Sequence, residues 1–220
     1  MQITNLTDPR SMIYSSNVYL IRGEESTIEN VNTLIDVGNN PAIVKTIQHT
    51  PPGVGKPTIA QVILTHSHFD HVALLPKIRE FFHPVVYAYS ALVGADVVLQ
   101  DGQKLRCGDR ELQVIYTPGH SDDSICLYCE AEGALFVGDT PMIIWSADGF
   151  YDERFVRALA WLCERDVQTI YFGHGNPVTV DAQTVLAESL HAVKAAQFRG
   201  TAKERIAATM GAAQLLQKVC

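Results

Sequence analysis

The residues best suited to chemistry are histidines and aspartates that follow short apolar runs. Residues 65–71 read THSHFDH and come directly after the apolar run at 59–64. Three more apolar runs end shortly before His120, Asp139 and His174, and a glycine precedes each of these residues. Glycine lets the backbone turn sharply or approach a ligand closely. Because side chains at strand ends can converge from distant parts of a sequence, we expect these residues to form one site.

Two of these histidines are spaced to bind one metal ion together. His66 and His68 are two residues apart, so their side chains point to the same side of an extended stretch. Neutral imidazole and carboxylate groups suit a borderline divalent ion such as zinc. His120 can supply the third ligand. Five of the eight histidines of the chain lie in these turns, which argues against a chance arrangement.

The remaining polar residues can hold a second ion a short distance away. Asp70 and His71 lie just beyond the first pair, where the chain turns, and His174 completes their set. A single carboxylate, Asp139, can bridge both ions. Two metals about 3.5–4 Å apart generate hydroxide and stabilise both the attacking and the leaving oxygen. The sequence therefore predicts a dinuclear metal centre.

The elements that position this site alternate along the chain. Short apolar runs closed by turn residues predict strands at residues 17–21, 32–38, 59–64, 85–88, 112–116, 125–128, 135–137 and 169–172. Helical spacing of apolar residues predicts helices at 41–49, 76–82, 152–164, 181–197 and 201–218. Strands come first and then alternate with helices, which favours a layered αβ architecture.

The composition is that of a globular chain with a sizeable core. Of the 220 residues, 47% are hydrophobic and 19% are charged, which excludes disorder. The apolar runs are shorter than the roughly 18 residues of a membrane span, so no membrane partner is expected. The net charge of −7 argues against a nucleic-acid partner. Five cysteines and an N-terminus without the pattern of a signal peptide indicate a reduced, cytoplasmic protein.

Five motifs resemble those of the metallo-β-lactamase superfamily and occur in the same order. Besides THSHFDH they are LIDVG at 34–38, TPGHS at 117–121, FVGD at 136–139 and FGHG at 172–175. The resemblance implies an α+β fold, a four-layer αβ/βα sandwich with two mixed β-sheets and metals at one edge. It also implies the assignment made above, with one ion at His66, His68 and His120, a second at Asp70, His71 and His174, and Asp139 between them.

The ligand set is similar to that of the glyoxalase II, lactonase and broad hydrolase branch, because Asp70 and His71 are both present and residue 139 is aspartate. The main hypothesis is a hydrolase in which hydroxide bound to two zinc ions attacks an ester, thioester or lactone of a small molecule. Asp70 would be a ligand and a proton carrier, hence catalytic. Iron or manganese suits the same ligands. The alternatives are a mononuclear iron persulfide dioxygenase, a ribonuclease or phosphodiesterase of the family, and a binding module without catalysis.

Residues outside the metal site lead to further predictions. Residues 1–200 are expected to form the hydrolase domain, and the helix at 201–220 to pack on it or on a neighbouring subunit of a homodimer. Asp36 either supports the histidine loop, residues 65–71, or only forms a turn. The C-x-x-C pair at Cys126 and Cys129 lies in a predicted strand, where its sulfurs point to opposite faces, so no metal or redox role is expected. Apolar residues at 12–14 and, after Asp139, Trp145, Phe150 and Tyr151 are candidates for the walls of the site.

Overall fold

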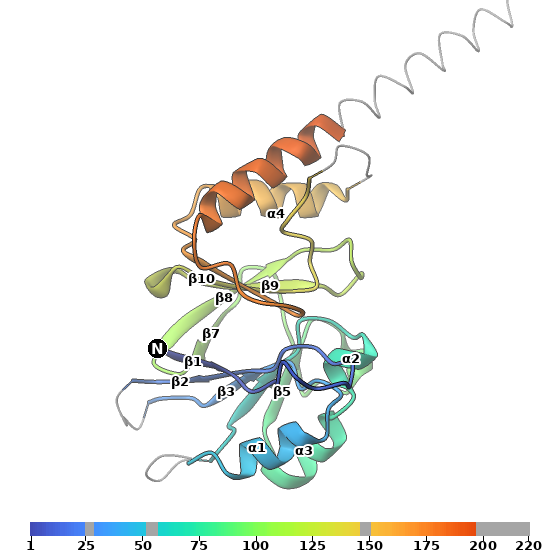
Figure 1. Ribbon diagram of the computed structural model, residues 1–220, viewed down its shortest axis with the longest axis vertical. Coiled ribbons are helices and arrows are strands. Elements are labelled where there is room, and N and C mark those ends of the chain that lie inside the picture. The colour runs from blue at the N-terminus through green and yellow to red at the C-terminus, as the bar shows by residue number, and fades with distance from the viewer. Residues whose placement is uncertain (25–28, 52–56, 146–150, 197–220) are drawn as a thin grey trace, which may run out of the picture.

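The protein is described by a computed structural model over residues 1–24, 29–51, 57–145 and 151–196. Two β-sheets face each other in it, and helices cover both outer faces (Figure 1). This confirms the predicted four-layer sandwich with two mixed sheets. The predicted helix at 201–218 and the domain boundary at residue 200 lie outside the described residues.

The first sheet has its strands in chain order. They are β1 (Gln2–Asn5), β2 (Tyr19–Arg22), β3 (Thr33–Ile35), β4 (Gln61–Ile63), β5 (Val85–Ala88) and β6 (Val97–Val98). β1, β2 and β3 pair antiparallel, whereas β3 to β6 pair parallel. Parallel neighbours need a crossover connection, and the helices α1 (Ala42–Gln48) and α3 (Leu75–Phe82) lie in these crossovers. Both helices cover the outer face of this sheet, below it in Figure 1.

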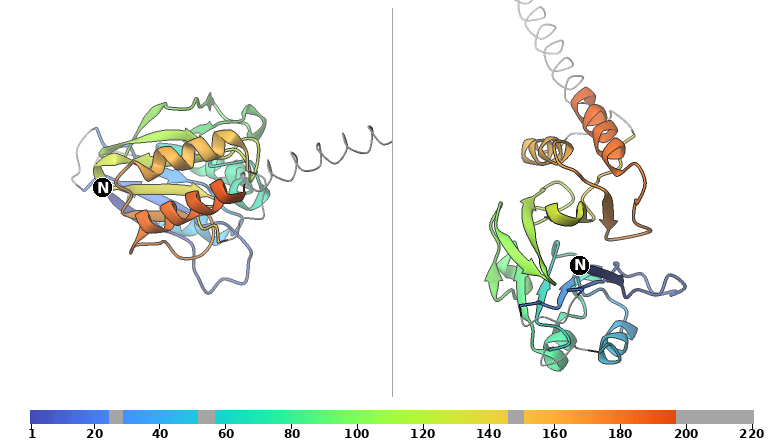
Figure 2. Two further views of the ribbon diagram at one scale, coloured as in Figure 1. Left: turned by 90° about the horizontal axis from the view of Figure 1, so that it is seen from above. Right: turned by 90° about the vertical axis from the view of Figure 1, so that its left-hand side faces the viewer.

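The second sheet has the order β11-β10-β9-β8-β7. Its strands are β7 (Lys104–Cys107), β8 (Arg110–Tyr116), β9 (Ile125–Cys129), β10 (Ala134–Gly138) and β11 (Thr169–Phe172). β10 and β11 pair parallel, and the other neighbours pair antiparallel. The helix α4 (Glu153–Cys163) and a helix over residues 182–196 lie side by side on the outer face of this sheet (Figure 2). The described elements also include two short 3-10 helices, Ala91–Val93 and Glu130–Glu132.

Strands that are buried on both faces explain the unbroken apolar runs of the sequence. In the first sheet, Leu34 belongs to the cluster under α1 and α3, whereas its neighbour Ile35 belongs to the cluster between the two sheets. The helix at 182–196 contributes Leu186 and Val193 to the outer cluster of the second sheet. The helix predicted at 181–197 therefore packs on the outer face of the second sheet. Among the described helices, none has the length and apolar character needed to cross a membrane.

Three strands were missing from the sequence prediction, and the largest boundary difference is at the end of β3. β1 and β7 were not predicted, because these edge strands mix polar and apolar residues and carry no apolar run. β6 was not predicted because it is only two residues long. The predicted strand at 32–38 ends at Ile35, since Asp36 and Gly38 have positive φ values of 58° and 71° that turn the backbone. The two cysteines of the C-x-x-C pair lie in different clusters, Cys126 under the outer helices and Cys129 between the sheets, as predicted.

Candidate metal centre

The candidate metal centre lies at the edge of the sandwich where strands of both sheets end. β8, β10 and β11 run in the same direction and therefore end at the same edge. The backbone N–H of Ile125 donates to the carbonyl of Thr65 at 2.9 Å and joins the end of β4 to this edge. A one-turn helix, α2 (Phe69–Val72), follows (Figure 1). The structure brings together all the residues predicted for the site, namely His66, His68, Asp70, His71, His120, Asp139 and His174.

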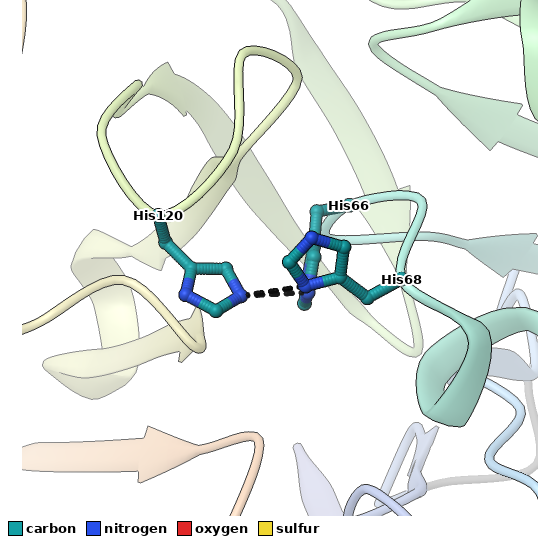
Figure 3. A group of neighbouring side chains, drawn as sticks. All are labelled: His66, His68 and His120. Carbon is teal, nitrogen blue, oxygen red and sulfur yellow. Dashed lines mark hydrogen bonds between the residues drawn. The ribbon is translucent and has the colours of Figure 1, made fainter.

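The first group contains three imidazoles. His120 Nε2 lies 2.8 Å from His68 Nδ1 and 3.2 Å from His66 Nε2. The three side chains come from two loops and point toward one another (Figure 3). His66 is buried, whereas His68 and His120 are exposed at the mouth of the site. Three ring nitrogens from two distant parts of the sequence therefore lie close together.

The spacing of these nitrogens fits a small cation. One proton on His120 Nε2 can serve only one of its two contacts, whereas a cation between the rings serves all three nitrogens. A tetrahedral zinc ion bound at 2.0–2.1 Å separates its nitrogen ligands by about 3.3 Å. The observed separations of 2.8 and 3.2 Å are close to this value.

The second group combines carboxylates with imidazoles. Its members are Asp70, His71, Asp139 and His174. Asp70 Oδ2 lies 2.9 Å from His174 Nε2 and 3.9 Å from His71 Nε2. Two of these atoms, Asp70 Oδ2 and His71 Nε2, are buried, and neither makes a well-aligned hydrogen bond among the described residues. Buried polar atoms without a partner are costly, so a ligand between them would offset that cost. The donor set and these two atoms fit a divalent ion.

The Asp139 carboxylate lies close to ligand atoms of both groups. Its Oδ1 lies 3.2 Å from His71 Nε2. Its Oδ2 lies 3.5 Å from His174 Nε2 and 3.6 Å from His120 Nε2. The carboxylate therefore sits between the two groups, where the sequence predicted a bridging ligand.

Charge is strongly coupled within the second group. Burial lowers the pKa of His71, but the charge of Asp36 and hydrogen bonds to Asp139 and Asp36 outweigh it and raise this pKa to about 10. Burial opposes ionisation of Asp139, yet hydrogen bonds from His174 and His71 hold its pKa well below the usual range. Hydrogen bonding to Asp139 also raises the pKa of His174. Without a metal, protons on these histidines neutralise the carboxylates.

The first group has the opposite preference. Burial, followed by the charge of His71, lowers the pKa of His66 to about 4. Burial also lowers the pKa of His120. Neutral imidazoles are the form that binds metals, so these two rings are ready to bind at neutral pH.

Comparison with known proteins gives the family. The family model for the metallo-β-lactamase superfamily matches residues 13–97 and 93–142. This chain belongs to the metallo-β-lactamase superfamily. The hydroxyacylglutathione hydrolase of Francisella tularensis subsp. novicida is 40% identical over 82 residues, which are 36% of this chain and 32% of that protein. The match thus spans about a third of the length of the curated relative.

Solved structures share the superfamily fold with this chain. ETHE1 from Myxococcus xanthus has a TM-score of 0.61 at 23% identity, covering 90% of this chain and 85% of that one. The BLEG-1 B3 metallo-β-lactamase has a TM-score of 0.59 at 19% identity, covering 83% of this chain and 96% of that one. At this identity the likeness shows the shared fold.

In this metallo-β-lactamase fold, Asp36 positions histidines of both groups. It is buried, and its Oδ2 accepts hydrogen bonds at 2.8 Å from His71 Nδ1 and from the Thr65 hydroxyl. The Thr65 oxygen in turn lies 3.2 Å from His66 Nδ1 and can accept its proton. Protons on both Nδ1 atoms leave the Nε2 lone pairs of His66 and His71 free to bind a metal. Of the two roles considered for Asp36, the structure favours support of the histidine loop. Thr65 carried no signal in the sequence beyond its place before His66.

Two glycines leave room for this packing. A Cβ atom at Gly138, which has a φ of 53°, would come within 2.5 Å of the Thr65 hydroxyl. A Cβ atom at Gly173 would collide with the Asp139 carboxylate and approach His71 Cε1 to 2.7 Å. Glycine at both positions is therefore required for the histidine loop and Asp139 to lie this close together.

The predicted wall residues are only partly at the site. Tyr14 stacks on His174, with ring centroids 5.0 Å apart and ring planes 16° apart. Met12 and Trp145 are largely exposed. Tyr151 packs against Phe155 and the outer core instead. Phe150 lies outside the described residues.

Proposed function

We propose that the chain is a metal-dependent hydrolase with two divalent ions, zinc being the metal that best suits its ligands, and that it cleaves an ester, thioester or lactone. The observation that carries this proposal is Asp139, whose carboxylate lies within 3.6 Å of nitrogen ligands in both groups. A carboxylate in this position could bind two metal ions at once, one in each group.

The chain would supply ligands, orientation and a proton carrier. His66, His68 and His120 would hold one ion, and Asp70, His71 and His174 the other, with Asp139 bound to both. When bound, such a pair makes hydroxide available near neutral pH and polarises the scissile carbonyl. Asp36 and Thr65 would keep the Nε2 lone pairs of His66 and His71 directed at the ions. Asp70 would carry a proton to the departing group, because its carboxylate lies in the second group, 2.9 Å from His174 Nε2.

The proposal also includes a substrate class and a cellular compartment. The curated relatives are named hydroxyacylglutathione hydrolases, so a thioester of this kind is the first substrate to test. The matched segment covers only about a third of the relative. Esters and lactones are therefore tested alongside the thioester. The described cysteines, Cys107, Cys126, Cys129 and Cys163, are all free thiols, which supports a reducing compartment such as the cytoplasm.

The experiment combines metal analysis with a substrate panel. Protein purified without added metal is analysed for transition metals and assayed on a hydroxyacylglutathione, an aryl ester, a lactone and a phosphodiester. His120→Ala serves as the site variant, and His49→Ala is its control, because His49 is an exposed residue that bonds only the Lys45 carbonyl. Metal-dependent cleavage that His120→Ala loses and His49→Ala keeps is expected. A chain that binds no transition metal and is not activated by zinc or manganese would overturn the proposal.

A second candidate function rests on the internal pairing of the second group. His174 and Asp70 lie 2.9 Å apart, and His71 lies between Asp36 and Asp139, so this group can balance its charge with protons alone. A single iron at His66, His68 and His120 would then suffice for a persulfide dioxygenase. One iron per chain and oxygen consumption with glutathione persulfide, both retained in His174→Ala, would favour this function over hydrolysis.

A further inference from the structure

We propose that Tyr14 is a catalytic residue whose hydroxyl donates a hydrogen bond to the substrate oxygen that becomes negatively charged during hydrolysis. This inference rests on the hydrolase proposed above. Tyr14 belongs to none of the five superfamily motifs and comes from the loop between β1 and β2.

The position of the Tyr14 ring points into the site. The ring stacks on His174, and its hydroxyl lies 3.5 Å from His174 Nε2, the atom that this residue offers to a metal. When a metal occupies the Nε2 lone pair, the Tyr14 proton cannot be accepted there. The hydroxyl is then a free donor beside the second group, and a tyrosine hydroxyl remains protonated at neutral pH.

Core packing does not account for this position. Tyr14 is 72% exposed, so its ring buries little apolar area that would stabilise the fold. An aromatic side chain that is mostly exposed and lies flat on a candidate metal ligand is better explained by contact with a substrate than by packing.

The loop that carries Tyr14 is attached to both loops of the second group. The Ser16 N–H donates to the Asp70 carbonyl at 3.1 Å, and the Asn17 N–H donates to the Gly173 carbonyl at 2.6 Å. The Asn17 side chain also donates to the Gly175 carbonyl at 2.9 Å. Next to Tyr14 itself, the Asn39 N–H donates to the Ser15 hydroxyl at 2.8 Å. The chain directly after Tyr14 is therefore fixed to the site before a substrate arrives, and such preorganisation makes a donor effective in catalysis.

The step in which Tyr14 acts is addition to the carbonyl. The oxygen of water forms a bond to the carbonyl carbon and loses one proton to Asp70, and the π electron pair moves onto the carbonyl oxygen. Tyr14 donates a hydrogen bond to that oxygen and keeps its own proton. When the intermediate collapses, the pair returns to form the carbonyl, and the leaving group departs with its bonding electrons and receives a proton from Asp70.

The test compares two substitutions that each remove one hydroxyl. Tyr14→Phe keeps the ring on His174. Its control is Tyr128→Phe, which removes a hydroxyl that donates to the Asp166 carbonyl at 3.2 Å, outside the site. We expect Tyr14→Phe to lower kcat about 10- to 100-fold, less than a fully buried oxyanion donor is worth, because water competes at an exposed position. The KM, the metal content and the activity of Tyr128→Phe should stay close to those of the unsubstituted protein.

A binding measurement separates this role from a structural one. Phenylphosphonate, a tetrahedral anion, is titrated into the metal-loaded protein and into Tyr14→Phe, and its affinity should fall in the variant. Unchanged kcat and unchanged phosphonate affinity in Tyr14→Phe, with an active unsubstituted protein, would overturn the role of Tyr14 and leave the hydrolase intact. Loss of metal from Tyr14→Phe would overturn it too, in favour of ligand positioning. An unsubstituted protein without metal-dependent hydrolysis would overturn the hydrolase, and this role with it.

Discussion

Replacing Asp36 by asparagine tests how the fold prepares the metal ligands. Asparagine tolerates the positive φ of 58° at this position and has nearly the same shape, so the backbone should stay in place. The carboxylate accepts three hydrogen bonds, one from the Thr65 N–H, one from the Thr65 hydroxyl and one from His71 Nδ1, each at 2.8 Å. An amide has one oxygen and one NH2 group, so it cannot accept on both sides.

Each orientation of the new amide has a defined cost. With its oxygen toward the Thr65 N–H, the NH2 group faces His71 Nδ1, which must then give up its proton to become an acceptor. The proton of neutral His71 would move to Nε2 and block the lone pair that is needed for a metal. With the oxygen toward His71, the NH2 group faces the Thr65 N–H and leaves a buried donor unpaired. One unpaired buried donor lowers the free energy of unfolding by about 1–3 kcal/mol. Disturbing a residue that orients a metal ligand typically lowers metal affinity by about 10- to 100-fold.

The assay is a zinc titration against a competing chelator, together with thermal unfolding of the metal-free protein. Asp181→Asn is the matched control, because Asp181 also has a positive φ, 56°, but is exposed and lies outside the site. We expect Asp36→Asn to weaken zinc binding and to lower the unfolding temperature, and Asp181→Asn to do neither. Zinc affinity in Asp36→Asn within about threefold of the unsubstituted protein, below the lower limit for such residues, would refute the reasoning.

Three further predictions use the same measurements. Asp139→Ala should weaken the binding of both zinc ions, whereas His120→Ala should weaken the binding of only one. If Asp139→Ala binds two zinc ions with unchanged affinity, a bridging role of Asp139 is excluded. Zinc affinity at the second group should rise with pH by up to about tenfold per unit, because the ion must displace the proton of His71. The pKa of His71 is raised to about 10, above its unfolded value. The stability that its proton contributes to the metal-free protein should therefore be lost as pH rises through about 10. Zinc titrations measure the change in affinity with pH, and thermal unfolding measures the loss of stability. Cys126→Ser and Cys129→Ser should each change activity less than about threefold, because Cys126 lies in the core under the outer helices and Cys129 in the core between the sheets. A larger loss in hydrolysis assays would contradict their exclusion from the site.

The sequence by itself determined the chemistry of the site and the layers of the fold. His66 and His68 are two residues apart, and this spacing alone directs both side chains to one side of an extended chain. Apolar runs such as 59–64 predicted strands buried on both faces, which only a layered arrangement can cover. These inferences depend on local periodicity and residue type, and both can be read from a single chain.

Contacts between distant residues needed the tertiary structure. The role of Asp36 stayed open between a turn and a support, because nothing local indicates that its carboxylate lies 2.8 Å from a histidine ring 35 positions later. Tyr14 looked like one of several wall residues until its hydroxyl was found beside His174, 160 positions away. Such contacts depend on how the loops at one edge of two sheets are joined, and that geometry is set by packing across the whole domain rather than by any local pattern.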